Sequence, residues 1–160
     1  MDKLLKLLQE NARFSNERLA AMLGITEQEV ADKIEEYEKK GIIKGYQVLL
    51  NYDKIQPEQV TALIELKVTP KRNLGFEEIA RTIMMYEEVE SVYLMSGGYD
   101  LSVRVTAKDF KDVALFVSHR LAILDSVLST ATHFILSRYK ENGVILYDEP
   151  VDERRGVAFL

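Results

Sequence analysis

Along residues 1–46 the apolar side chains return every three or four positions, which is the spacing of one face of an α-helix. The pattern predicts three helices, at about 2–10, 16–23 and 27–40. Ser15 and Thr26 stand at the N-cap positions of the second and third helices, and Glu29 completes a capping box with Thr26. The first part of the chain is therefore predicted to be a small helical unit.

Beyond residue 46 the pattern changes to strand-like runs rich in Val, Ile, Thr and Tyr. We expect helices at about 75–86 and 108–124, and strands at about 60–69, 89–96, 99–106 and 126–138. A further strand at about 45–52 would link this part to the helical unit. The order β-α-β-β-α-β with right-handed crossovers predicts an antiparallel, ferredoxin-like sheet with its helices on one face.

Together these patterns predict an α+β protein with two domains. We expect a winged-type helix-turn-helix over residues 1–46 and a ferredoxin-like βαββαβ domain over residues 60–139. A linker strand and loop at 47–59 would join them. Residues 140–160 are expected to form a polar C-terminal tail, in which Pro150 breaks regular structure.

Three small residues carry the helix-turn-helix hypothesis. Ala20 lies where two helices would cross, and a larger side chain there would push them apart. Gly24 supplies the positive φ of the turn, and Val30 closes the core beneath. The alternative interpretation is an ordinary small helical hairpin with a glycine between its helices.

The composition excludes several classes of protein. The chain has 160 residues, a net charge of −5, no cysteine and two histidines, His119 and His133, so thiolate metal sites and disulfides are excluded and no cofactor is expected. No apolar run approaches the about 20 residues of a membrane span, and residues 1–5 do not resemble a signal peptide. We therefore expect a cytoplasmic protein without a membrane partner. Ser118 and His119 are adjacent on a predicted helix and point to different sides, so a catalytic pair is not expected.

The predicted third helix is unusually acidic for a helix that enters the major groove of DNA. Over residues 26–40 it carries six acidic and three basic side chains, whereas contacts to phosphate dominate the affinity of DNA-binding proteins. We therefore expect binding to double-stranded DNA that is weak per protomer and sensitive to salt. The candidate DNA-contacting residues are Arg13, Ser15, Arg18, Gln28, Ala31, Asp32, Lys33, Lys39, Lys40 and Lys44. For any single one of them, a solvated surface position is the alternative.

The sequence resembles the Lrp/AsnC family of transcription regulators over roughly residues 1–140. The marks of the resemblance are Asn11-Ala12-Arg13, Leu19-Ala20, Leu23-Gly24-Ile25, Val30, Ile34, Glu38, Gly41-Ile42-Ile43, Gly45-Tyr46, Gly98-Tyr99-Asp100-Leu101 and Thr130-Ala131-Thr132. The resemblance implies a helix-turn-helix followed by a ferredoxin-like RAM domain, small effectors that are usually amino acids, and dimers that assemble further. Ala31 and Asp32 depart from the family pattern, which usually has Arg or Lys there.

The predicted sheet also argues for an oligomer. Alternate residues from Val60 to Val68 form one apolar face, and in the strand at 126–138 both faces carry apolar groups. Helices cover only one face, so we expect a second copy to cover the other and to give a homodimer that assembles to a tetramer or octamer. The alternative is that the tail at 139–160 folds back over the sheet.

A glycine-containing turn is the candidate effector site. Asp100 could pair with a ligand ammonium group, and backbone N–H groups or the hydroxyls of Thr130 and Thr132 could receive its carboxylate. An amino acid presents both groups. The full candidate set is Met95, Gly97, Gly98, Tyr99, Asp100, Thr130 and Thr132. The alternative is a plain hairpin turn followed by a polar residue at a strand start.

Two other functions remain open at this point. The first is a ligand-sensing module whose degenerate helix-turn-helix no longer binds DNA, which would suit the acidic third helix. The second is an enzyme that resembles the sirohaem decarboxylases, which share the fold, although the scarcity of histidine and clustered arginine disfavours it.

Overall fold

The computed structural model describes residues 2–55, 58–69 and 75–146. The chain separates into two compact units, Met1–Leu49 and Leu50–Leu160, and each is described by itself below. The end of the expected tail, 147–160, lies outside the described residues.

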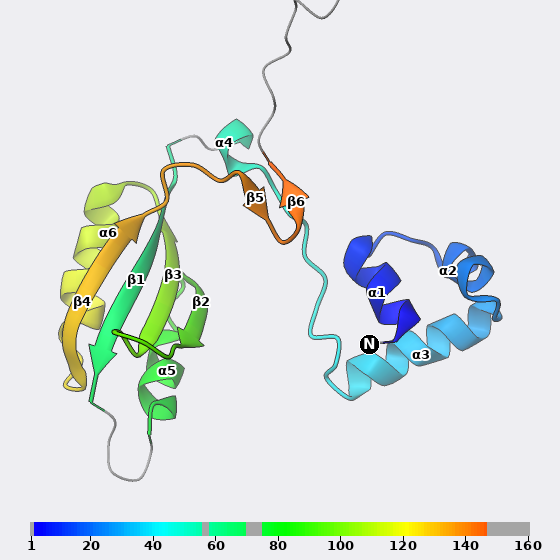
Figure 1. The fold of residues 1–160 in the computed structure, drawn as a ribbon, viewed down its shortest axis with the longest axis horizontal. Coiled ribbons are helices and arrows are strands. Elements are labelled where there is room, and N and C mark those ends of the chain that lie inside the picture. Colours follow the sequence, from blue (N-terminus) through cyan, green and yellow to red (C-terminus); the bar gives the residue numbers. More distant parts are fainter. Residues whose placement is uncertain (1, 56–57, 70–74, 147–160) are drawn as a thin grey trace, which may run out of the picture. The chain divides into compact units, whose positions relative to one another are not determined.

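The first unit consists of three helices, which confirms the helical prediction (Figure 1). They are α1 (Lys3–Glu10), α2 (Asn16–Leu23) and α3 (Glu27–Lys39). Both halves of the predicted capping box are formed: the N–H of Glu29 donates to Thr26 Oγ1 (3.2 Å), and the N–H of Thr26 donates to Glu29 Oε2 (2.7 Å). Gly24 has φ +70°, as the turn between α2 and α3 requires.

The core of this unit is the one that helix-turn-helix geometry requires. Leu19 and Val30 are fully buried, and Ala20 is buried at the crossing of α2 and α3. Two expectations are wrong. Residues 2–49 contain no strand, so the unit is trihelical and not winged, and the linking strand expected at 45–52 is absent. Residues 44–50 find no ladder partner among the described residues, and the segment ends in the single helical turn α4 (Tyr52–Ile55).

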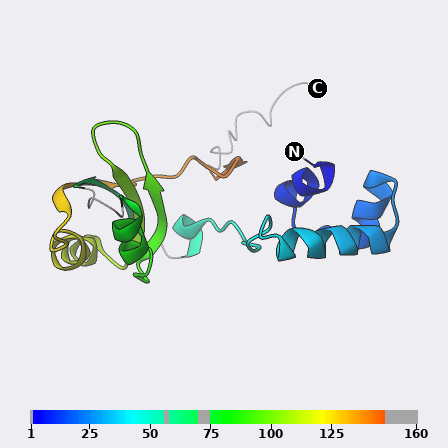
Figure 2. The same cartoon turned by 90° about the horizontal axis from the view of Figure 1, so that it is seen from below.

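The second unit is a four-stranded antiparallel sheet in the order β2-β3-β1-β4, which confirms the ferredoxin-like prediction. Its strands are β1 (Val60–Val68), β2 (Val89–Leu94), β3 (Leu101–Ala107) and β4 (Val127–Phe134). The helices α5 (Glu77–Ile83) and α6 (Phe110–Phe116) lie on the same side of the sheet (Figure 2). Alternate residues of β1 and β3, such as Ile64 and Val103, are buried beneath them.

The helix expected at 108–124 is not regular. After α6 the chain forms a π-helical turn, Val117–Leu121, in which the N–H of Ala122 donates to the carbonyl of Val117 (2.8 Å). Leu121 is completely buried at the end of this turn. The extra residue of a π turn therefore brings Leu121 to the core side.

The expected polar tail begins with a hairpin instead. Strands β5 (Lys140–Glu141) and β6 (Val144–Ile145) pair across Asn142 and Gly143, which both have positive φ (46° and 86°). Asn-Gly is a strong sequence signal for a two-residue hairpin turn, and this signal could have predicted the hairpin. The strand expected at 126–138 ends at Phe134.

The face of the sheet opposite the helices is more polar than expected. In the register, Phe134, Thr132 and Thr130 of β4 stand opposite the buried Ala62, Ile64 and Leu66, so they lie on the helix side. The open face is left with Ser129, Ala131 and His133 of β4, so Ala131 is the one apolar side chain among these three.

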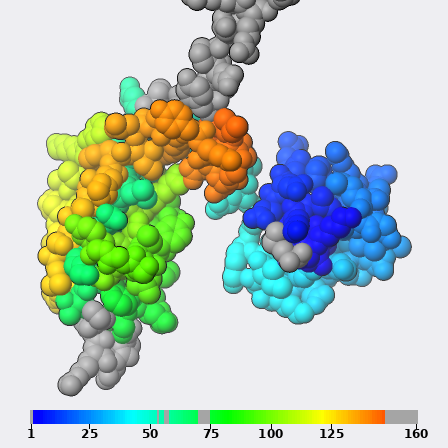
Figure 3. Space-filling view, in the orientation of Figure 1, coloured from blue at the N-terminus to red at the C-terminus, as the bar shows by residue number. Residues whose placement is uncertain are grey.

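Hydrogen bonds and ion pairs cross the open face. His133 lies 3.1 Å from Glu65, and Arg104 contacts Glu90 (3.0 Å) and Glu141 of the hairpin (2.6 Å). The hairpin thus reaches the sheet through Glu141 but leaves most of the open face uncovered (Figure 3). On this open face the large apolar side chains of Leu63 and Tyr93 are 37% and 57% exposed.

Candidate DNA-binding and effector sites

The first turns of α3 present an exposed polar surface. Gln28 and Asp32 lie one turn apart, and Gln28 Nε2 donates to Asp32 Oδ1 (2.8 Å). Lys33 makes no ion pair within 4.0 Å to any described residue. Ala31 is half-buried and lines the open hollow beside α3. Of the candidate residues on these turns, the exposed ones are Gln28, Asp32 and Lys33.

The lysines at the end of α3 are engaged within the helix. Lys39 Nζ lies 2.5 Å from Glu35, and Lys40 Nζ lies 2.5 Å from Glu36. Both pairs are well exposed and join residues four apart, so they contribute little to stability and are screened by salt. A phosphate group could displace either glutamate.

The remaining candidate cations lie outside α3. The Arg18 guanidinium stacks on the Phe14 ring (4.6 Å to the centroid), while Ser15 Oγ accepts the N–H of Arg18 (3.2 Å) as the N-cap of α2. Arg13 is exposed. Lys44 folds back over Gly41. If Gly41 carried a Cβ atom, that atom would lie 2.8 Å from Lys44 Nζ. This places a cation beyond the C-terminus of α3, where the helix dipole favours it.

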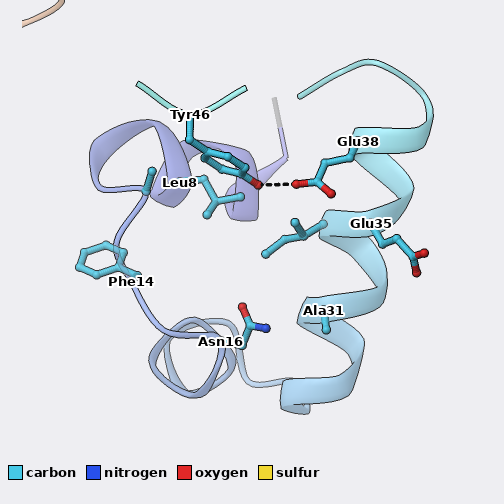
Figure 4. A pocket seen from close by; sticks show the side chains of 9 residues that line it. Leu8, Phe14, Asn16, Ala31, Glu35, Glu38 and Tyr46 are labelled. Atoms are coloured by element: carbon cyan, nitrogen blue, oxygen red, sulfur yellow. Dashed lines mark hydrogen bonds between the residues drawn. The ribbon is translucent and has the colours of Figure 1, made fainter. Parts of the chain in front are cut away.

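An open hollow of about 350 Å³ lies beside α3 in the same unit (Figure 4). Leu8, Phe14 and Ala31 contribute to its wall, and the Tyr46 hydroxyl donates to Glu38 Oε1 (2.9 Å) at one side. Burial, followed by this bond to Glu38, raises the pKa of the Tyr46 hydroxyl. Tyr46 thereby fastens the segment after α3 to the helix, a contact that the sequence analysis did not predict.

The candidate effector residue Asp100 already has partners within the chain. Its Oδ2 accepts the N–H of Val68 (2.9 Å), and its Oδ1 lies 3.2 Å from Lys67 Nζ. Its own N–H donates to the carbonyl of Leu66 (2.9 Å). The Val68 N–H, with a smaller contribution from Lys67, lowers the pKa of the Asp100 carboxyl. Asp100 therefore joins the β2–β3 hairpin to the end of β1.

The other candidate effector residues are divided between two places. Met95, Gly97, Gly98 and Tyr99 surround the hairpin turn, where Gly97 has φ +146° and Met95 is exposed. Thr130 and Thr132 lie on β4, beyond β1, with side chains toward the helices. A single chain thus does not bring the Thr130 and Thr132 hydroxyls together with Asp100.

Comparison with known proteins identifies both units. Residues 2–38 match the AsnC-type helix-turn-helix domain, and residues 61–145 match the Lrp/AsnC ligand binding domain. YugG of Bacillus subtilis, an uncharacterized HTH-type transcriptional regulator, is 47% identical over 153 residues, which cover 95% of this chain and 92% of that protein. The chain belongs to the Lrp/AsnC family of transcriptional regulators. The Haemophilus influenzae leucine-responsive regulatory protein is 25% identical, with 90% of this chain and 86% of that protein covered.

Solved structures of Lrp/AsnC regulators share the fold. A transcriptional regulator from Neisseria meningitidis in complex with L-Met superposes with a TM-score of 0.72 at 23% identity, covering 88% of this chain and 93% of that one. Escherichia coli AsnC gives a TM-score of 0.69 at 19% identity, covering 88% of this chain and 95% of that one.

Membership in the Lrp/AsnC family decides between the broad classes of function. The helix-turn-helix implies double-stranded DNA as a partner, and the ligand-binding domain implies a small-molecule effector. The protein is a transcriptional regulator and not an enzyme, so the sirohaem-decarboxylase alternative is set aside. Among the described helices, none has the length and apolar character needed to cross a bilayer.

Proposed function

We propose that this Lrp/AsnC regulator controls genes of amino-acid metabolism and that an amino acid changes its DNA affinity or its oligomeric state. The observation that carries the proposal is the complete trihelical core, which holds α3 by a formed capping box and leaves Gln28, Asp32 and Lys33 on its exposed first turns. Because such a regulator acts on the chromosome, its expected compartment is the cytoplasm.

DNA would be held mainly through phosphates. Arg13, Arg18 and Lys44 flank α3, and Lys39 and Lys40 could exchange their exposed glutamate partners for phosphate oxygens. Since each protomer has few cations that are not already paired, the proposed binding depends on two helix-turn-helix units acting together on a two-fold operator.

The amino-acid effector would bind beside the β2–β3 hairpin. The turn offers the backbone groups of Gly97 and Gly98, the exposed side chain of Met95 and the carboxylate of Asp100. Because Asp100 already has two partners and the hydroxyls of Thr130 and Thr132 lie elsewhere, the site would be completed by another copy of the chain. The L-Met complex of the Neisseria relative supports an amino acid as the ligand class.

Titration of fluorescent promoter DNA from the protein's own gene tests this function. We expect binding that weakens steeply between low and physiological salt, and that changes when the effector amino acid is added. Lys33→Glu should weaken binding about tenfold or more, because it replaces an exposed cation on the proposed DNA-facing turns of α3 by an anion. Lys111→Glu, on the other unit, is the matched control and should bind as the wild type does.

One specific observation favours a second function. In α3 both lysines of the last turn pair with glutamates, and the helix is acidic overall. A ligand-sensing protein without DNA binding would show no anisotropy change even at low salt. That result would contradict the proposed regulator and favour the sensor.

A further inference from the structure

The second unit has an open hollow that the proposed effector site does not use. Its volume is about 390 Å³, and it lies where β3 ends and α6 begins. Leu115 and Phe116 form apolar wall, and the charged groups of Lys108, Arg120, Glu88 and Asp112 surround it. Small-molecule sites typically measure about 300–1,000 Å³, so this hollow has the size of a small metabolite site.

Charges of both signs line this hollow without neutralising one another. No ion pair within 4.0 Å joins Glu88, Asp112, Lys108 or Arg120 to each other or to any other described residue. Elsewhere in this unit nearby opposite charges do pair, as Arg104 does with two glutamates. The separated charges of the hollow are available to a ligand that carries an anionic and a cationic group.

An aromatic ring, and not a carboxylate, holds the Arg120 side chain at the hollow. Its guanidinium lies over the Tyr86 ring (5.3 Å to the centroid). Tyr86 in turn packs edge-on against the buried Phe116, with ring centroids 5.6 Å apart. Stacking of this kind fixes the plane of the guanidinium and leaves its N–H groups free to bind a ligand carboxylate at two points.

The π-helical turn at Val117–Leu121 is a second, independent sign of a ligand site. π-helical turns are rare in proteins, and many of those that do occur lie at functional sites. Here the turn contributes both His119 and Arg120 to the wall of the hollow, while Leu121 is buried in the core. In a regular α-helix, His119 and Arg120 would point in different directions relative to the buried Leu121.

We propose that this hollow binds a free α-amino acid with an apolar side chain. Its carboxylate would bind Arg120 and Lys108, its ammonium group would bind Glu88 and Asp112, and its side chain would lie against Leu115. A zwitterion satisfies both sets of charges with a single molecule.

The hollow and the hairpin are different sites on the same domain. Leu101 at the hairpin and Ala107 at the hollow are the two ends of β3, which are about 20 Å apart at the usual rise of a strand. The inference therefore requires neither DNA binding nor an effector at Asp100.

Calorimetric titration of the full chain with leucine, methionine and phenylalanine tests the proposal. We expect at least one to bind, and Arg120→Gln and Asp112→Asn each to weaken that binding about tenfold or more, because each removes a charged hydrogen-bond partner. Lys111→Gln and Asp125→Asn are the matched controls, since they remove exposed charges that do not line the hollow, and they should bind as the wild type does.

Ligand analogues test the same contacts on the wild-type chain. They therefore replace the variant if Arg120→Gln unfolds when the stacking on Tyr86 is lost. The methyl ester lacks the ligand's anionic group and the N-acetyl derivative lacks its cationic group, so both should bind the wild type about tenfold or more weakly. The proposal is overturned if none of the three amino acids binds, or if the analogues bind equally well. Binding that is lost in Asp100→Asn but kept in Arg120→Gln and Asp112→Asn would also overturn it, while leaving the regulator proposal standing.

Discussion

Asp100 shows how one carboxylate can suit both a structural and a ligand-binding interpretation. Its position after a Gly-Gly turn predicts contact with a ligand ammonium group. In the structure the Val68 N–H and Lys67 Nζ already contact the two oxygens, so the carboxylate ties the hairpin to β1. Its role toward a ligand remains a prediction, whereas its internal contacts have a consequence for stability that can be measured directly.

Asp100→Asn should reduce the dependence of stability on acid pH. The pKa of Asp100 is lowered in the folded chain, so its carboxylate stabilises the fold above the unfolded pKa of about 3.9. This contribution is lost as the pH falls through the lower, folded pKa. The variant should therefore be less stable than the wild type at neutral pH and should lose less stability on acidification.

Urea unfolding midpoints between neutral and strongly acid pH measure this difference. Asp125→Asn, which removes an exposed carboxylate, serves as the control and should follow the wild-type curve. Parallel curves for Asp100→Asn and the wild type would show that the Val68 contact contributes nothing to folding.

Two of the candidate DNA-contacting lysines form ion pairs with glutamates of α3, and the sequence prediction did not include these pairs. Lys39 and Lys40 each follow a glutamate by four positions, and this spacing by itself predicts an ion pair on a helix. The position of Ala31 could not be predicted as easily, because its half-burial depends on where residues 8–14 pack against α3.

At the scale of elements, helices with strong local signals are predicted well and irregular turns are not. The boundaries of α2 and α3 lie within one residue of the prediction, because Ser15, Thr26 and Gly24 fix the caps locally. The π turn after α6 has the same apolar spacing as a continuous helix. Its origin is the burial of Leu121 against the sheet, which is a tertiary requirement.

Gly143→Ala should open the β5–β6 hairpin. Gly143 has φ +86°, and a left-handed backbone costs a residue with a Cβ about 1–2 kcal/mol. Because the hairpin has only two short strands, we expect faster amide hydrogen exchange at Leu146, whose N–H donates to the Tyr139 carbonyl. Gly98→Ala is the control, since Gly98 lacks a positive φ and has open space around it. Unchanged exchange at Leu146 would contradict this account of the turn.

At the scale of the whole molecule, the open face of the sheet is the proposed contact with a second copy. Leu63 and Tyr93 are exposed on a face that is otherwise polar and ion-paired. The argument for a dimer therefore rests on these exposed side chains and on the need for two DNA-binding units, and not on a wholly apolar face.

Leu63→Glu should convert the proposed dimer into a monomer. A carboxylate at the centre of the interface would lose its hydration on association and would also face Glu65 of the same strand. Light scattering coupled to size-exclusion chromatography gives the mass directly. Met85→Glu is the control, because Met85 is 78% exposed on the segment after α5. A mass unchanged by Leu63→Glu would place the interface elsewhere.

Local signals in the sequence were enough to predict the three helices of the first unit, the β-α-β-β-α-β order and the family resemblance, although not the absence of a wing. These signals are the capping residues, glycine turns and the periodicity of apolar positions. The face of β4 that meets the helices follows only from the tertiary structure, because it depends on the register in which Thr130, Thr132 and Phe134 pair with β1. The tertiary structure also decided the partners of Asp100 and the hollow beside α6, since contacts between distant residues depend on how the strands align.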